Sequence, residues 1–236
     1  MQVDLNPNLS EDEMPLFPLN VVLFPGDILP LHIFEQRYRL MTQFCMDHDR
    51  LFGVVLIKSG QEVGEPAEAY LVGTAVKIIE TERLEDGRIN LLTLGQHRFQ
   101  TVKIRQDLPY LVGQVRTFGT DEIGAQEDAG MLVLKASQLY QTYESLLGEL
   151  VPEWKPVEEI PTNLYHLSYQ IGTRLQISVK AKQQLLEILP INQLLSREIE
   201  LLEQENQKLR ASLSIQSTLE KHKPTEVPLW KGVSLN

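Results

Sequence analysis

The chain has 236 residues, 42% of them hydrophobic and 23% charged, which predicts a folded globular protein of one large domain or two small ones. Its formal net charge of −10 makes nucleic acid and anionic lipid unfavourable partners. The single cysteine excludes an internal disulfide, and a polar, acidic N-terminus without signal-peptide character predicts a cytoplasmic protein.

Residues 1–13 are polar and are predicted to be flexible, whereas the stretch MPLFPLNVVLFPGDILPLHIF that follows is strongly apolar. It is long enough to cross a bilayer, which takes roughly 20 residues. However, Pro18, Pro25 and Pro30 would interrupt a helix repeatedly, and broken backbone pairing is costly in lipid. We interpret the stretch as strand, turn and strand, with Pro25 and Gly26 at the centre of a type II turn. Pro18 and Pro30 then mark edges or strand ends, and no membrane span is expected.

The apolar spacing changes after Phe34 and becomes helical. Tyr38, Met41 and Cys45 share one face of a helix predicted over residues 35–48. Short β-type runs follow, and the Asp86–Gly87 pair is typical of a hairpin turn. Gly73 lies inside a long run and favours a bulge or a bend there. The predicted strands cover residues 51–57, 69–84, 87–95, 97–106 and 110–118, which predicts a compact β-barrel or pseudo-barrel over residues 14–118.

Residues 119–130 form a polar, glycine-bearing linker, and residues 131–215 read as a helical bundle. The first helix carries an amphipathic stripe, and the proline-rich segment 151–161 ends it. Residues 162–171 predict a second helix that Gly172 terminates. Ser178 is a candidate N-cap for the third helix, and Pro190 precedes a last long one. Residues 216–236 are predicted to be a mobile tail. The amphipathic stripe of the first helix consists of Leu132, Ala136, Leu139, Tyr143, Leu146 and Leu150.

The last helix has a heptad spacing, in which Leu195, Ile199, Leu202, Asn206 and Leu209 recur at intervals of four and three. A lone asparagine at an a position is a known device for specifying a two-stranded coiled coil. Two interpretations remain open. The helix packs on its own bundle, or it makes a short coiled-coil contact with a second copy of the chain and forms a homodimer.

The motifs of catalysis are missing. Gly119 and Gly124 have P-loop spacing, but Ala125 occupies the position of the phosphate-binding lysine. The five histidines are scattered, and their spacing predicts no metal site. Lys58 and Ser59 are adjacent next to a turn, and adjacency alone does not make a Ser-Lys dyad. Cys45 is predicted to be buried and inert, and Glu35 with Arg37 is predicted to form a capping or ion-pair contact. The sequence therefore predicts no catalytic residue, no metal and no cofactor.

Several stretches taken together resemble a known family. They are PLFPLNVVLFPGDILPLHIFEQRY, FGVVLI, VGTAVKI, DGRINLLTLGQHRF and PYLVGQV, all between residues 14 and 118. They are similar to the N-terminal substrate-binding (LON) domain of the ATP-dependent Lon protease, a pattern shared by stand-alone bacterial proteins and by the LON-type domain of cereblon. The resemblance implies an α+β fold, with a PUA-like β pseudo-barrel carrying one inserted helix, followed by an α-helical bundle that ends in a long helix.

In Lon this region engages substrate polypeptides and adaptors. The resemblance therefore implies a non-catalytic polypeptide-binding module linked to protein quality control, whose partners are unfolded polypeptides or a protease or adaptor. The motifs of Lon's ATPase and Ser-Lys peptidase modules are not found, so no family catalytic residue carries over. Two alternatives are an RNA-associated PUA-like protein, which the acidic charge disfavours, and a dimeric scaffold. The sequence does not identify the residues that would bind substrate.

Overall fold

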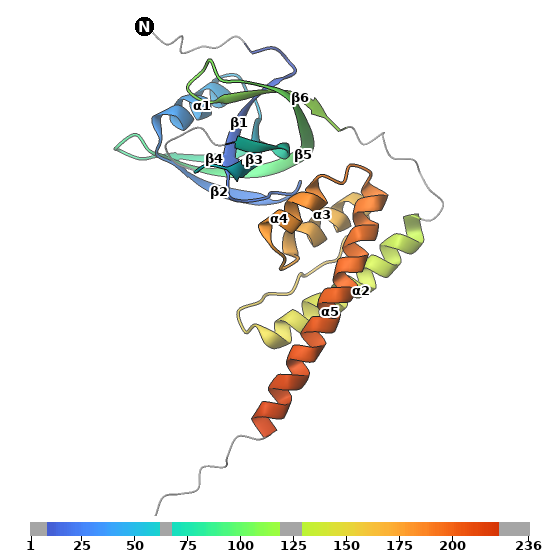
Figure 1. Cartoon of the computed structure of the whole chain (residues 1–236). Coiled ribbons are helices and arrows are strands. Elements are labelled where there is room, and N and C mark those ends of the chain that lie inside the picture. The colour runs from blue at the N-terminus through green and yellow to red at the C-terminus, as the bar shows by residue number, and fades with distance from the viewer. Residues whose placement is uncertain (1–8, 62–67, 119–128, 222–236) are drawn as a thin grey trace, which may run out of the picture.

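The computed structural model describes residues 9–61, 68–118 and 129–221. Within these ranges the first half of the chain forms strands around one helix and the second half forms helices (Figure 1). The two halves lie end to end, and the last helix points away from the strands. The strands are β1 (Glu13–Leu19), β2 (Ile28–Ile33), β3 (Phe52–Ser59), β4 (Glu68–Arg83), β5 (Ile89–Arg105) and β6 (Leu111–Thr117). The helices are α1 (Gln36–Asp47), α2 (Ala129–Leu150), α3 (Leu164–Arg174), α4 (Val179–Leu186) and α5 (Ile191–Lys221).

The strands close into a small barrel. Hydrogen-bonded neighbours follow the order β2-β5-β4-β3-β1-β6, and an additional pairing of β5 with β6 closes the ring. β1 runs parallel to β3, and the other pairings between the described strands are antiparallel. β2 pairs with β5 and flanks the ring. α1 lies between β2 and β3 in the chain, and the bundle follows β6. The predicted α+β fold is therefore confirmed: a pseudo-barrel with one inserted helix is followed by a bundle that ends in a long helix.

The turn predicted at Pro25 and Gly26 is present, but the strands on its two sides do not pair with each other. The amide of Asp27 donates to the carbonyl of Phe24 at 3.2 Å, and Gly26 has a φ of +87°, which glycine adopts without strain. β1 ends at Leu19 and pairs with β3 and β6, whereas β2 pairs with β5. Residues 20–24 leave the sheet because Val22 and Phe24 pack into the core of the bundle.

The prediction of two strands over 87–95 and 97–106 is wrong, because β5 is continuous through this region. Its pairing with β4 shifts register between the partners of Ala75 and Val76, so a bulge takes up the irregularity without ending the strand. Gly95 lies at this bulge. The segment around Phe24 passes so close to it that a Cβ on residue 95 would lie 2.7 Å from the carbonyl oxygen of Phe24. The hairpin turn before β5 is confirmed by Gly87, which has a φ of +81° and donates its amide to Leu84.

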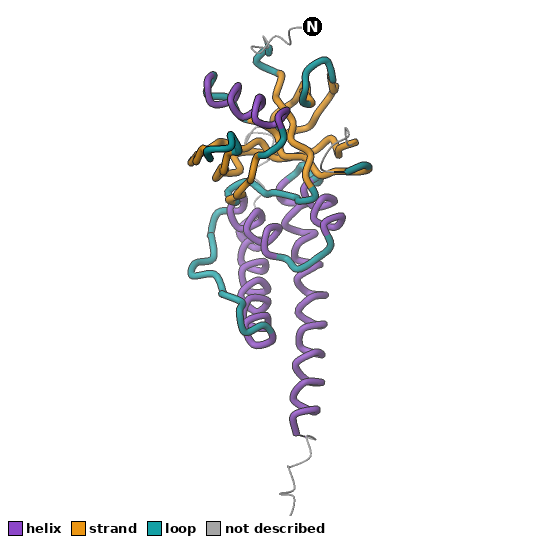
Figure 2. The backbone as a smooth tube through the Cα atoms, turned by 90° about the vertical axis from the view of Figure 1, so that its left-hand side faces the viewer, coloured by secondary structure: helices purple, strands orange, loops and turns teal. Residues whose placement is uncertain are grey.

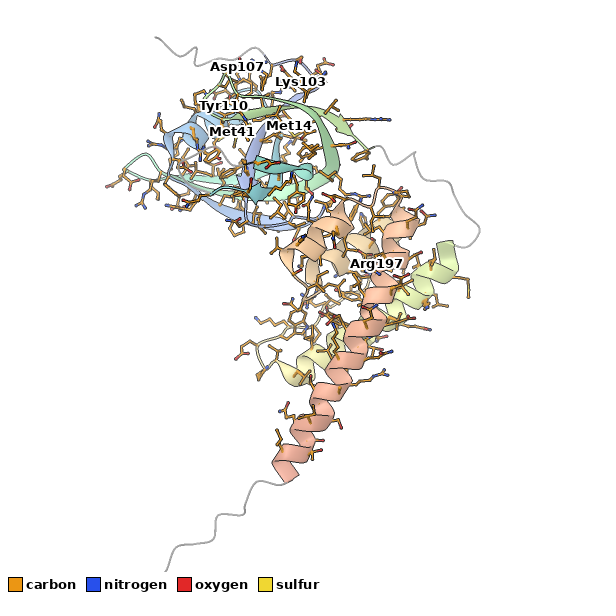
Figure 3. All side chains as sticks on the ribbon, viewed as in Figure 1. Met14, Met41, Lys103, Asp107, Tyr110 and Arg197 are labelled. Carbon is orange, nitrogen blue, oxygen red and sulfur yellow. The ribbon has the colours of Figure 1, made fainter. Side chains whose placement is uncertain are left out.

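The barrel has its own apolar core, which α1 covers on one side. Tyr38, Met41, Phe44 and Cys45 of α1 are buried, as the helical spacing predicted. Met41 of α1 and Tyr110 both belong to this core, and Figure 3 shows Lys103 with Asp107 at the end of the barrel farthest from the bundle. The burial predicted for Cys45 is confirmed, and it raises the pKa of the thiol to about 12.

The bundle is built on α2 and α5, which run side by side below the barrel, while α3 and α4 lie between them and the strands (Figures 1 and 2). Ser178 caps α4 as predicted, because its hydroxyl accepts from the amide of Ala181. Gly172 does not end α3, which continues to Arg174. Its missing side chain instead accommodates Phe24, whose ring would lie 2.6 Å from an added Cβ.

Three predicted boundaries differ from the structure. Residues 9–13 contact the barrel, since Leu9 is buried in its core and the guanidinium of Arg50 donates to the carbonyls of Leu9, Ser10 and Glu13 at 2.6–2.9 Å. α2 begins at residue 129 rather than 131, and α5 continues to Lys221 rather than ending at 215. The rest of the predicted linker and tail lies outside the described residues.

None of the helices in the described part of the chain is long and apolar enough to span a membrane.

Candidate functional site

The barrel and the bundle share one hydrophobic core at their junction. Val22, Phe24, Leu56 and Val72 of the barrel pack among the buried side chains of all four bundle helices. Phe24 is fully buried against α3 at Gly172. A shared apolar core of this kind positions the two halves firmly against each other, so grooves along the junction have walls of defined shape.

Arg98 of β5 connects the barrel to the end of α4 and the corner before α5. Its side chain is almost completely buried, and its guanidinium donates to the carbonyls of Leu186, Ile188 and Leu189 at 3.1, 2.5 and 2.9 Å. These carbonyls end α4 and begin the corner before α5, where a helix leaves acceptors unpaired and carries partial negative charge. The same guanidinium lies over the ring of Tyr169, 5.5 Å from its centre.

A second polar contact joins the turn before β2 to the helices. Lys182 of α4 donates to the carbonyl of Thr173, and it faces Asp27 of the barrel. Burial raises the pKa of the Asp27 carboxyl and lowers that of the Lys182 ammonium, while their mutual attraction opposes both shifts.

A groove of about 620 Å³ runs between the barrel and α3. Aromatic and apolar side chains make up much of its wall, and a second hollow of about 400 Å³ continues along α3 beyond Gly26. The two hollows share Pro25, Gly26, His166 and Tyr169, so they form one groove, which we call the α3 groove. Its further apolar wall residues are Leu94, Phe118, Tyr165, Leu189, Pro190 and Val157.

Two residues that line the α3 groove carry buried polar atoms that have no hydrogen-bond partner among the described residues. They are Nε2 of His97 and Oε1 of Gln170. Burial lowers the pKa of His97 and favours a neutral imidazole, which can donate from one ring nitrogen and accept at the other. An unpaired buried polar group is unfavourable, and both atoms are covered by the protein itself.

The sequence did not indicate this groove, because its residues lie far apart in the chain. His97 lies on β5 and His166 on α3, and neither has a neighbouring motif. The remaining histidines of the described regions have local contacts: His32 pairs with Asn90 at 2.7 Å, and His48 with the carbonyl of Phe44 at 2.9 Å. In residues 9–61, 68–118 and 129–221, no group of three or more His, Cys, Asp or Glu side chains could hold a metal ion.

The residues considered for acid–base chemistry form ordinary ion pairs. Arg37 contacts Glu35 at 3.0 Å, which confirms the predicted ion pair. Lys58 and Ser59 both donate to the carboxylate of Glu68, at 2.6 and 2.9 Å. The hydrogen bond that Lys58 donates to Glu68 raises the pKa of Lys58, whereas a lysine that acts as a general base needs a lowered pKa.

The heptad stripe of α5 is covered by the chain's own bundle. Leu195, Ile199, Leu202 and Asn206 are buried in the core that α5 shares with α2, and Leu209 is partly buried beside it. The amide of Asn206 donates to the carbonyl of Leu139 on α2 at 2.9 Å. Within the described structure, these residues therefore contact the other helices of the chain's own bundle, and Asn206 contacts α2.

Comparison with known proteins now identifies the family. Residues 13–204 match the family model of the ATP-dependent protease La (LON) substrate-binding domain. The chain belongs to this family. The resemblance inferred from the sequence is therefore confirmed, and the match includes both the barrel and most of the bundle of this LON domain.

Among curated relatives, the chain is 29% identical over 211 residues to a Lon protease of Solibacter usitatus, covering 88% of this chain and 26% of the relative. It is 24% identical over 221 residues to the Lon protease of Escherichia coli, covering 92% of this chain and 28% of the relative. The chain thus spans about a quarter of the length of these relatives.

Two solved structures share the fold. A Lon N-terminal domain protein from Xanthomonas campestris superimposes with a TM-score of 0.55 and 24% identity, covering 78% of this chain and 95% of the other. The N-terminal domain of a Mycobacterium avium complex Lon protease superimposes with a TM-score of 0.58 and 16% identity, covering 81% and 98%. At these identities the similarity establishes a shared architecture. It does not identify the ligand, which depends on the side chains.

Proposed function

We propose that this LON domain is a non-catalytic module that holds exposed apolar segments of other polypeptides in the α3 groove. The observation that carries the proposal is the groove itself, which combines an aromatic wall with a few polar side chains such as Asn163 and His166. Apolar walls with a few polar groups are typical of ligand sites. Membership of a substrate-binding family supports a polypeptide as the ligand.

Several contacts support binding without bond cleavage. Ser59 donates to Glu68 rather than facing a neutral lysine, and the raised pKa of Lys58 keeps its ammonium charged. Burial keeps the Cys45 thiol protonated, so it is a poor nucleophile. A bound polypeptide would then be passed on intact, and a separate protease or adaptor would act on it as part of protein quality control.

The test compares an unfolded with a folded ligand on the immobilised chain. We expect a reduced and carboxymethylated globular protein to be retained and its native form to pass. His166→Asp should weaken retention about tenfold, because His166 is exposed and lines both hollows of the groove, where a charge repels an apolar ligand.

The matched control is His32→Asp, another exposed histidine that lies on β2 away from the α3 groove. Equal retention of the unfolded and native forms would overturn polypeptide recognition, and equal binding by the two variants would overturn the α3 groove as its site. A structured RNA is tested in parallel at physiological salt. Retention of RNA in place of unfolded protein would favour the nucleic-acid alternative.

A further inference from the structure

The barrel has a second opening where β4 and β5 separate. The ladder between them ends at the pair Val72–Gln100. Before Val72, β4 pairs with β3 through Ala69 and Glu68, and beyond Gln100, β5 keeps only its pairing with β6, which lies on its other edge and already includes Phe99 and Gln100. Residues 68–71 of β4 therefore have no ladder partner on their β5 side within the described structure. Main-chain amides and carbonyls at such an edge are ready to pair with another extended chain.

Side chains of α4 and the corner that follows it lie at this opening. Gln183 is buried, and its amide nitrogen donates to the carbonyl of Val72 at 3.1 Å, at the last pair of the ladder. The same nitrogen donates to Glu187 at 2.9 Å. Arg98 holds the carbonyls that follow α4. Helical side chains thus occupy the point at which the two strands would otherwise continue to pair.

The space between the separated strands is a groove of about 850 Å³, which we call the β4–β5 groove. Its apolar wall comes from Tyr70 and Leu71 on β4, Ile104 on β5, Leu111 on β6 and Leu189 at the helical corner. Leu71 is 49% exposed, which is unusual for a leucine inside a strand and leaves apolar surface free for a ligand.

The charges around the β4–β5 groove favour a basic ligand. Glu68 is neutralised by Lys58, whereas Glu187 accepts from the neutral side chain of Gln183 and keeps an uncompensated negative charge at the wall. The chain as a whole carries a net charge of −10, which adds a long-range attraction for cations.

We propose that the β4–β5 groove binds an extended, apolar polypeptide segment that carries a basic residue, by adding a strand to the free edge of β4. Strand addition uses main-chain hydrogen bonds for affinity and side-chain pockets for preference. The proposal rests on the proposed function in that the ligand is a polypeptide, and it adds a second site with its own selectivity.

The test measures fluorescence anisotropy of a labelled ten-residue peptide of alternating valine and threonine with one central lysine. Leu71→Lys should weaken binding at least tenfold, because it removes apolar contact and repels the basic ligand. Ile79→Lys is the matched control, since Ile79 is 44% exposed on the same strand and lies outside the groove. Both side chains are exposed, so both variants should keep the circular dichroism and thermal unfolding of the parent.

Peptide variants test the mode of binding. Replacing the lysine with glutamate should weaken binding at least fivefold. N-methyl groups on one or the other alternate set of residues remove main-chain donors on one side of the strand, so at least one of these two peptides should lose binding. Equal binding of both N-methylated peptides and the parent, or of the two protein variants, would overturn the proposal.

Retention of the carboxymethylated protein distinguishes a failure of the β4–β5 groove proposal from a failure of the proposed function. If the parent chain and Leu71→Lys retain it equally and the peptide binds both proteins equally, the β4–β5 groove is not a site and the proposed function stands. If the parent chain retains neither the unfolded protein nor the peptide, the proposed function fails as well.

Discussion

In the barrel the buried polar side chains are mainly threonines, whereas in the bundle they are carboxylates and amides. Thr74 and Thr93 each donate to a nearby carbonyl, of Leu23 and of Leu29. Glu144, Gln183, Glu198 and Asn206 of the helices are equally buried, and each has a partner on another element. The barrel and the bundle therefore bury different kinds of polar side chain.

The difference follows from where the backbone finds its hydrogen bonds. Strands bond to neighbouring strands, so the ladders of the barrel already specify which segments lie side by side. Helices satisfy their own backbone, and their relative positions depend on side chains alone. A few polar contacts therefore add to the apolar core in fixing the arrangement of the bundle. Loss of the contact with the most hydrogen bonds, that of Glu144, should be more damaging than changes to the threonines of the barrel.

The largest effect is expected at Glu144, whose carboxylate accepts two bonds from Arg174 at 2.7 Å and one from Trp154 at 3.0 Å. Glu144→Ala leaves these donors unpaired in a largely buried position and should lower the free energy of unfolding by about 3 kcal/mol. Urea unfolding measures the loss. Glu149→Ala, at an exposed position of the same helix, should change it by less than about 0.5 kcal/mol. Similar losses in the two variants would contradict the role of Glu144.

Alanine substitutions at two helical glycines, Gly172 and Gly148, test the contact between the barrel and the bundle. Gly172→Ala would place a Cβ 2.6 Å from the ring of Phe24 and should destabilise by about 1–3 kcal/mol through overpacking. Gly148→Ala meets only Pro156 at 3.5 Å, an ordinary contact, and should stabilise by about 0.5–1 kcal/mol. Opposite shifts in the midpoint of thermal unfolding are expected, and shifts of the same sign would mean that Phe24 moves aside freely.

A pH-dependent effect is expected at Glu198, which is fully buried and accepts from Ser168 at 2.7 Å. Burial raises its pKa well above the ordinary value of 4.5, although Ser168 and Arg98 oppose the shift. The folded chain therefore keeps a proton that the unfolded chain releases, so this group's contribution to stability falls as pH rises above 4.5.

Glu198→Gln removes this ionisation. The variant should match the parent in urea unfolding near pH 4.5 and exceed it at pH 8. Glu200→Gln on the exposed face of α5 is the control and should show no such divergence. A gap between Glu198→Gln and the parent that stays constant with pH would show that Glu198 does not titrate differently on folding.

The smallest effect is expected for Asn206→Leu. The carbonyl of Leu139 that accepts from Asn206 belongs to a helix and has a partner within it, and Oδ1 of Asn206 has no partner in the described structure. Stability should therefore change by less than about 1 kcal/mol. The molar mass from light scattering should stay unchanged, because α2 already covers this stripe. A change of oligomeric state would instead support the coiled-coil interpretation.

How far the sequence predicts the structure depends on the distance over which each signal acts. The helix at 36–47, the hairpin turn at Gly87 and the cap at Ser178 were predicted because each depends on neighbours a few residues away. The stripe of α2 was predicted only in part. Ala136 and Tyr143 are buried, but Tyr140 and Leu147 complete the buried face, because α2 packs against both α5 and α3.

The candidate sites were outside the reach of sequence reasoning. His97 and His166 carry no local motif, and they line one groove only because the barrel and α3 meet at Phe24. Likewise, nothing near Leu71 indicates that β5 leaves β4 at Val72, where Gln183, more than a hundred residues later in the chain, donates to the main chain.

By itself, the sequence determined that apolar strands punctuated by proline and glycine precede amphipathic helices, and it identified the family. These properties follow from backbone preferences and periodicity, which are local. The tertiary structure alone decided that Gly172 accommodates a ring instead of ending a helix, that the stripe of Leu195 and Leu202 is buried in the chain's own bundle, and where the grooves open. Those outcomes depend on packing between segments that only the folded chain brings together.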